Sequence, residues 1–169
     1  MTQRGVTFAE MFVVVAIMVV LAGVFVVPAY RAYGAARAPL NAAQTLAEDL
    51  ALLERVAKDG GRNQGSSLII TSANPLAYRG YRGRPTSIDP NSALGAVLVE
   101  HQFTGVVLAG GPIGTSTPLL FASNGSAQYV SSGVVADQHA TIEFSLTQLR
   151  GSRTALVDLD LFTGAVSLR

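Results

Sequence analysis

The chain has 169 residues with a formal net charge of +1, and charged residues make up only 14% of it. A charge so close to zero gives no overall electrostatic attraction for nucleic acid or for acidic partners. The sequence contains no cysteine, which excludes disulfides, cysteine-ligated metals and thiol catalysis.

The N-terminal part of the chain is strongly apolar. Residues 11–27 form an unbroken run of apolar residues and glycine, and Val6 and Phe8 extend it backwards. As a helix, residues 6–27 rise about 33 Å at about 1.5 Å per residue, which is enough to cross the hydrocarbon core of a bilayer. We therefore predict a transmembrane helix segment over residues 6–27.

Two simpler interpretations explain this segment less well. A secretory signal peptide has a shorter apolar region and small residues at its cleavage site, whereas bulky residues 25–27 precede Pro28 here. A plain signal anchor explains the length but not Glu10, because a carboxylate within the apolar run costs about 2.5 kcal/mol or more unless it is paired. The acid therefore predicts a functional site with a partner of opposite charge.

The residues around Glu10 suggest such a partner. The stretch Arg4-Gly5-Val6-Thr7-Phe8-Ala9-Glu10 resembles the prepilin peptidase motif of type IV pilins and type II secretion pseudopilins. In that family cleavage follows the glycine, and the fifth mature residue is glutamate. The resemblance implies removal of the leader, residues 1–5, by cleavage between Gly5 and Val6, and N-methylation of Val6. It also implies pairing of Glu10 with the Val6 α-amine of a neighbouring subunit, which would neutralise both charges.

Residues 28–59 are predicted to continue the helix as an amphipathic segment outside the membrane. Pro28, Gly34 and Pro39 are expected to kink or break it locally. Beyond them apolar residues recur at spacings of three and four, namely Ala43, Leu46, Leu50, Leu53 and Ala57. The polar faces are assigned to Glu48, Asp49, Arg55 and Lys58. The pair Gly60-Gly61 is a stop signal for the helix.

Residues 66–169 have the pattern of an antiparallel β domain. Short apolar, β-branched runs predict strands over residues 68–71, 96–103, 106–109, 119–122, 128–131, 141–146, 155–161 and 165–168. Asn124-Gly125 and Phe162-Thr163-Gly164 are expected to turn two hairpins. Residues 74–91 contain three prolines and two glycines, so we expect a long loop or a variable insertion there.

The β region extends the resemblance. Residues 119–125, followed by a polar strand, and a closing hairpin over residues 156–168 are similar to the C-terminal domain of the GspH/FimT group of pseudopilins and minor pilins. The resemblance implies an α+β fold, in which a long N-terminal helix packs on an antiparallel β-sheet domain. It implies a structural subunit of a type II secretion or type IV pilus filament, and no enzyme.

The same resemblance implies the partners and the location. The partners would be prepilin peptidase, other pilin or pseudopilin subunits, the inner membrane, and a secretion or pilus assembly platform driven by a separate ATPase. The chain would cross the inner membrane once, with its C-terminal domain in the periplasm, and would enter a filament after assembly.

The sequence predicts no catalytic residue, no cofactor and no metal site. His101 and His139 are far apart in the sequence and are interpreted as structural histidines. Asp158 and Asp160 alternate with leucines, which predicts the solvated face of a strand. A calcium site is the alternative for these two acids, but the surrounding sequence lacks a ligand loop.

A basic stretch supports an alternative function. Arg79, Arg82 and Arg84 are interleaved with Tyr78 and Tyr81, a pattern that suits phosphate contact and base stacking. Some minor pilins of the FimT kind take up DNA through basic residues, so the alternative is a DNA-binding minor pilin. The near-zero net charge favours the simpler interpretation, a loop with solvated arginines.

Overall fold

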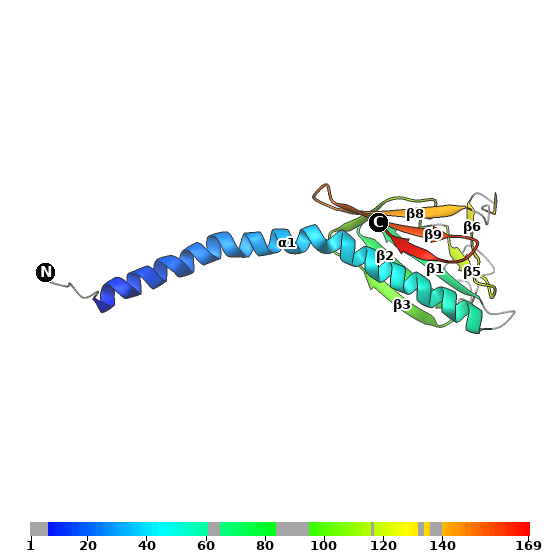
Figure 1. The fold of residues 1–169 in the computed structure, drawn as a ribbon, viewed down its shortest axis with the longest axis horizontal. Helices are drawn as coiled ribbons and strands as arrows, with labels where there is room; N and C mark the ends of the chain where they lie inside the picture. The colour runs from blue at the N-terminus through cyan, green and yellow to red at the C-terminus, as the bar shows by residue number, and fades with distance from the viewer. Residues whose placement is uncertain (1–6, 61–64, 84–94, 116, 132–133, 136–139) are drawn as a thin grey trace. The chain divides into compact units, whose positions relative to one another are not determined.

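The computed structural model describes residues 7–60, 65–83, 95–115, 117–131, 134–135 and 140–169. The chain divides into two compact units, Met1–Ala36 and Arg37–Arg169. Its described elements are, in chain order, one helix and ten strands. Figure 1 labels the helix and most of the strands. The fold is α+β, as the sequence predicts.

Helix α1 runs from Phe8 to Asp59. It is continuous through Pro28, Gly34 and Pro39, so the expected local break is wrong. A proline inside a helix removes one backbone hydrogen bond and costs roughly 3 kcal/mol. The bonds on either side of these residues are sufficient to keep the helical path in a helix of this length.

Besides the helix, the described part of unit Arg37–Arg169 contains two antiparallel sheets. The larger sheet has the order β3-β2-β1-β5-β6-β7, and the smaller has the order β10-β9-β8-β4. The larger sheet contains β1 Ser66–Ala73, β2 Leu76–Arg82, β3 Val97–Gln102, β5 Leu119–Phe121, β6 Ala127–Ser131 and β7 Val134–Val135. The smaller sheet contains β4 Val106–Gly110, β8 Thr141–Gln148, β9 Thr154–Asp160 and β10 Val166–Leu168.

Both predicted hairpin turns are confirmed. Gly125 lies between the paired strands β5 and β6 with φ 88°, and Gly164 lies between β9 and β10 with φ 74°. Glycine adopts this left-handed conformation without the steric penalty of a Cβ atom. The β9–β10 turn is closed by Asp160, whose Oδ1 accepts hydrogen bonds from the backbone N–H groups of Phe162 and Thr163.

The expected loop at residues 74–91 is wrong over its first half. Residues 76–82 form β2, which pairs with β1 on one side and with β3 on the other. Leu76 and Tyr78 are buried in the core, and Gly80 allows a close approach of the helix. This packing stabilises β2, although the prolines and glycines of this stretch are typical of a loop. Residues 84–91 lie outside the described residues. The short strand β7 was not predicted.

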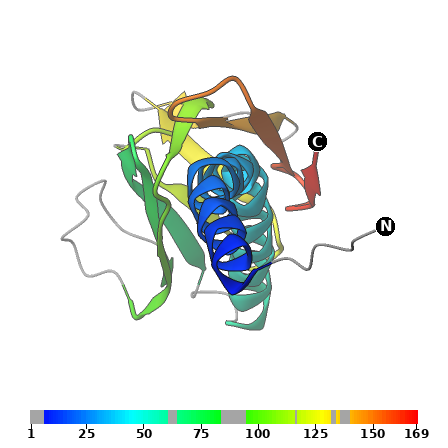
Figure 2. The ribbon, with the colours of Figure 1, turned by 90° about the vertical axis from the view of Figure 1, so that its left-hand side faces the viewer.

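The core lies between the helix and the two sheets. In the view along the helix, strands of the larger sheet lie on one side of the second half of α1, and strands of the smaller sheet lie on the other (Figure 2). Leu46, Leu50 and Leu53 are almost completely buried against Phe121, Phe144 and their neighbours in one hydrophobic cluster. Burying a leucine side chain stabilises a fold by about 1.5–3 kcal/mol. The second half of the helix is thus an integral part of the β domain.

Candidate functional site

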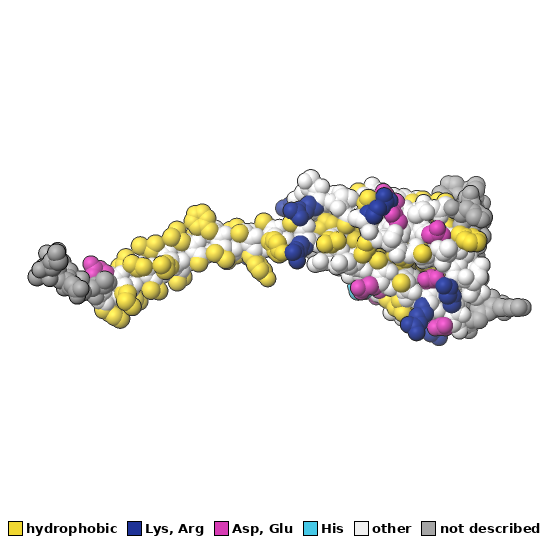
Figure 3. All heavy atoms as spheres, in the orientation of Figure 1, with side chains coloured by type: hydrophobic (Ala, Val, Ile, Leu, Met, Phe, Trp, Pro, Cys, Tyr) yellow, Lys and Arg dark blue, Asp and Glu magenta, His cyan; other side chains and the backbone are white. Residues whose placement is uncertain are grey.

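The helical part of unit Met1–Ala36 is covered with hydrophobic side chains (Figure 3). Large apolar residues such as Phe12, Val19 and Phe25 are each at least two-thirds exposed. Within the described residues, α1 is long and apolar enough to cross a membrane, judged by its length and composition. This composition fits anchoring in a membrane.

Glu10 lies in the first turn of this helix and has a local partner. Its Oε2 accepts hydrogen bonds from the Thr7 backbone N–H at 2.8 Å and from the Thr7 hydroxyl at 2.9 Å. The Glu10 N–H in turn donates to Thr7 Oγ1 at 3.3 Å. This reciprocal arrangement is a capping box, which satisfies free donors at the start of a helix. The predicted processing residues Gly5 and Val6 lie outside the described residues.

The capping box was missed in the sequence, although its signal was present. A threonine followed three residues later by glutamate, before an apolar run, is the pattern of a helix start. Thr7 and Glu10 fit it. Glu10, which is predicted to mediate assembly, therefore also caps the N-terminal end of α1 in the isolated chain.

The carboxylate of Asp49 is buried between the helix and the larger sheet. Asp49 is only 7% exposed, so its assignment to a polar, solvent-facing side of the helix is wrong. Tyr78 Oη donates to Asp49 Oδ2 at 2.7 Å, and His101 Nε2 lies 3.3 Å from the same oxygen. Burial, together with the hydrogen bond to Asp49, raises the pKa of Tyr78. His101 stacks on Phe103 with 5.8 Å between the ring centroids, so this histidine is part of the packing.

The basic residues of the DNA hypothesis lie on β2, apart from Arg84, which is outside the described residues. Arg79 donates to Glu100 Oε1 from Nη2 at 2.6 Å and from Nε at 2.8 Å, and these bonds raise the pKa of Arg79. Arg82 is exposed. Tyr78 and Tyr81 are 1% and 9% exposed, so neither ring is available for base stacking.

The acids of β9 differ from the expected solvated pair. Asp158 is 9% exposed, and its Oδ2 accepts a hydrogen bond from Arg169 Nε at 2.6 Å. Arg169 also lies 3.3 Å from Glu143 on β8, and the bond to Asp158 raises the pKa of Arg169. The expectation of a fully solvated face is therefore wrong for Asp158. Among the described residues, no group of three or more histidines or acids could hold a metal ion.

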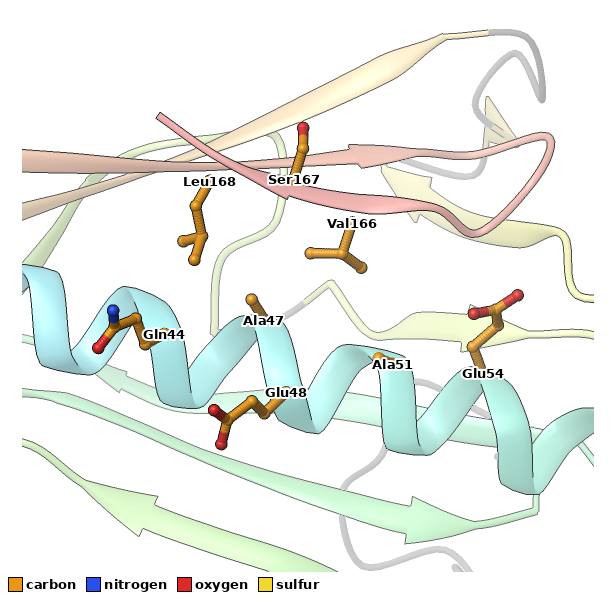
Figure 4. A pocket seen from close by; sticks show the side chains of 8 residues that line it. All are labelled: Gln44, Ala47, Glu48, Ala51, Glu54, Val166, Ser167 and Leu168. Atoms are coloured by element: carbon orange, nitrogen blue, oxygen red, sulfur yellow. The ribbon is translucent and has the colours of Figure 1, made fainter.

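A groove opens between α1 and β10 (Figure 4). It has a volume of about 540 Å³. The helix lines it with Gln44, Ala47, Glu48, Ala51 and Glu54, and β10 lines it with Val166, Ser167 and Leu168. The side chains of Val166 and Leu168 point toward the helix, whereas that of Ser167 points away (Figure 4). Nothing in the sequence linked these two distant segments.

The arrangement of helix and sheets is similar to that of a solved pilin. The crystal structure of the type IV minor pilin FimU from Pseudomonas aeruginosa matches with a TM-score of 0.53 and 14% sequence identity. The match covers 78% of this chain and 87% of FimU. No protein-family model and no curated protein matches the sequence. At this identity the likeness shows the fold, which is pilin-like.

Proposed function

We propose that this protein is a structural subunit, a pseudopilin or minor pilin, of a type II secretion or type IV pilus filament. The observation that carries the proposal is a single acid, Glu10, in the first turn of an exposed apolar helix that continues into a pilin-like domain. FimU, which has a similar fold, is a minor pilin.

Assembly is proposed to begin with processing. Prepilin peptidase would remove residues 1–5 and leave a new α-amine on Val6, which would be methylated. That amine carries a positive charge at the depth of the membrane, where an isolated charge is costly. Glu10 of one subunit would pair with the Val6 amine of its neighbour, so that association neutralises two charges together.

Before assembly, the capping box supplies the hydrogen-bond partners of Glu10. In the isolated chain, the Glu10 carboxylate is held by the N–H and hydroxyl of Thr7, which are neutral donors. These donors leave the negative charge of Glu10 uncompensated, whereas an ammonium group would neutralise it, and an unpaired charge is costly at the depth of the membrane. A neighbouring amine therefore competes favourably for the carboxylate, and we infer that Glu10 moves from Thr7 to the neighbour as the filament grows.

The apolar helix would hold the unassembled subunit in the inner membrane, with the β domain in the periplasm. An assembly platform with a separate ATPase would supply the energy for extraction. The β domain would then make the specific contacts on the filament surface.

The test separates the charge of Glu10 from its capping role. Glu10→Gln retains a side chain that can complete a capping box but removes the charge. We expect it to reduce the protein in sheared filaments by about tenfold or more, because hydrogen bonds to charged groups contribute about 1.5–3 kcal/mol. The readout is an immunoblot of filament and membrane fractions from cells that express the full chain.

The matched control is Thr7→Val, which removes the hydroxyl donor and keeps the size of the side chain. It should leave incorporation nearly unchanged, because the proposed partner in the filament is the Val6 amine. Normal incorporation of Glu10→Gln, together with failure of Thr7→Val, would show that this end of the helix is needed only for capping and would reject the pairing.

A further inference from the structure

Strand β10 is an edge strand of the smaller sheet, and among the described strands it pairs only with β9, on one side of its backbone. Its residues pair with β9 in the register Val166 with Leu159, Ser167 with Asp158 and Leu168 with Val157. Next to this ladder, the Asp160 N–H donates to Ala165 O, and Leu156 and Arg169 exchange two backbone bonds, all at 2.9 Å.

The positions of these bonds fix which backbone groups of β10 point outward. In an antiparallel pair, residues alternate between those that bond to the partner strand and those that do not. Ala165 and Arg169 form backbone hydrogen bonds with β9, so Ser167, which lies midway between them, does so as well. The N–H and C=O groups of Val166 and Leu168 therefore point away from β9. Within the described part of the chain, no hydrogen bond to these four groups is present.

The groove beside this edge has room for side chains. Its helical wall carries the small residues Ala47 and Ala51, and its other wall carries the apolar side chains of Val166 and Leu168. Leu168 is 42% exposed. A strand added to β10 would place alternate side chains into the 540 Å³ groove, over the two alanines.

The acidic residues that line the groove, Glu48 and Glu54, favour a ligand of opposite charge. Glu48 is exposed, and within the described residues it forms no ion pair, whereas Glu54 accepts a hydrogen bond from Lys58. Arg169 binds Asp158 and Glu143, which belong to the strands of the smaller sheet and not to the rim. The uncompensated charge along the groove is thus negative, which favours a basic partner.

We propose that the α1–β10 groove binds an extended, basic polypeptide segment, which adds a strand to the edge of β10. The backbone of the segment bonds to the outward groups of Val166 and Leu168, its apolar side chains cover Ala47 and Ala51, and a lysine or arginine faces Glu48. Strand addition of this kind draws affinity from main-chain bonds and specificity from alternate side chains. The inference concerns the β domain and is independent of the pairing proposed for Glu10.

The experiment measures the binding of a defined peptide to the full chain in detergent. The probe is dye-labelled Thr-Val-Thr-Lys-Thr-Val-Thr-Lys, followed by fluorescence anisotropy. We expect saturable binding that weakens by about fivefold or more when glutamate replaces each lysine, because like charges then face each other. Glu48→Lys should reverse this preference, and Asp59→Lys, with the same charge change outside the groove, should preserve it.

Two further variants test the edge and the groove separately. Leu168→Pro removes one outward N–H and none of the bonds to β9, a substitution that an edge strand tolerates. Ala51→Trp fills the groove from the helix and leaves β10 intact. Each should weaken peptide binding by about tenfold, since it removes part of the contact. Absence of saturable binding, equal binding of the glutamate peptide, or full binding by both Leu168→Pro and Ala51→Trp overturns the proposal.

Discussion

Tyr78 and Asp49 join the larger sheet to the helix through a buried hydrogen bond of 2.7 Å. Tyr78 lies on β2 and is 1% exposed, and Asp49 lies on α1 and is 7% exposed. A buried carboxylate is stable only when its oxygens have hydrogen-bond partners. This bond therefore ties the position of β2 to one side of the helix.

Replacing Tyr78 by phenylalanine should destabilise the β domain by about 1–3 kcal/mol, because the buried carboxylate of Asp49 loses one hydrogen-bond donor. The chain has no tryptophan, so chemical unfolding is best followed by circular dichroism. Tyr30→Phe is the control, since Tyr30 is 78% exposed. Equal stability of Tyr78→Phe and the wild-type protein would contradict a stabilising role for the bond.

The same tyrosine predicts a dependence on alkaline pH. The pKa of Tyr78 is raised above its ordinary value of 10.0, first by burial and then by Asp49. Above that pH the unfolded chain releases the tyrosine proton while the folded chain retains it, so stability falls as pH rises. Below pH 10 this contribution is fully present. The alkaline decrease in unfolding free energy should be smaller in Tyr78→Phe than in wild type.

Gly80 lies in a tightly packed part of β2, between a side chain of β3 and a side chain of the helix. A Cβ atom at this position would lie 2.5 Å from Val99 Cγ2 and 3.0 Å from Leu53 Cδ1. Gly80→Ala should therefore lower stability by about 1–3 kcal/mol through overpacking. Gly114→Ala, where no atom of the described residues lies within 4 Å of a Cβ, should change stability by less than about 0.5 kcal/mol. Removing the obstruction with Val99→Ala should recover part of the loss in the double variant.

Processing can be tested directly at the N-terminus of the mature protein. Cleavage after Gly5 predicts that N-terminal sequencing of protein from membranes with active prepilin peptidase begins at Val6. Intact mass should show the loss of residues 1–5, with one added methyl group on the new amine. An intact Met1 in such membranes would leave the apolar helix as a simple anchor.

Binding to duplex DNA can be tested separately. Arg79 is already paired with Glu100, and the net charge is +1, so we expect no saturable binding of duplex DNA. Binding through phosphates would decrease steeply with salt. A gel-shift titration at several salt concentrations should show no such dependence. Retention that disappears when Arg79, Arg82 and Arg84 become alanine would instead favour the DNA-uptake alternative.

The sequence predicted those features that depend on local patterns. Short apolar, β-branched runs identified β8 and β9, and the glycines at positions 125 and 164 identified two hairpins. The long apolar run identified the first half of the helix. In each of these cases the residues that determine the structure are neighbours in the chain, so a short window contains the whole signal.

Features that depend on distant contacts could not be predicted in this way. Residues 76–82 contain Gly80, which weakens the strand pattern. The reason for this glycine lies elsewhere in the chain, because Val99 on β3 and Leu53 on the helix leave no room for a Cβ atom. Asp49 appeared to be a solvated acid because its partners, Tyr78 and His101, lie on later strands. The groove beside β10 likewise depends on how two ends of one domain meet.

The contact between Thr7 and Glu10 has a consequence for the reuse of subunits. If the proposed function holds, Glu10 of a protomer that leaves a filament loses the amine of the neighbouring subunit. Thr7, three residues away on the same chain, is still available as a hydrogen-bond donor. The Glu10 carboxylate can then accept hydrogen bonds from Thr7 and does not remain without a partner in the lipid. Retraction and renewed growth can then draw on one pool of intact molecules.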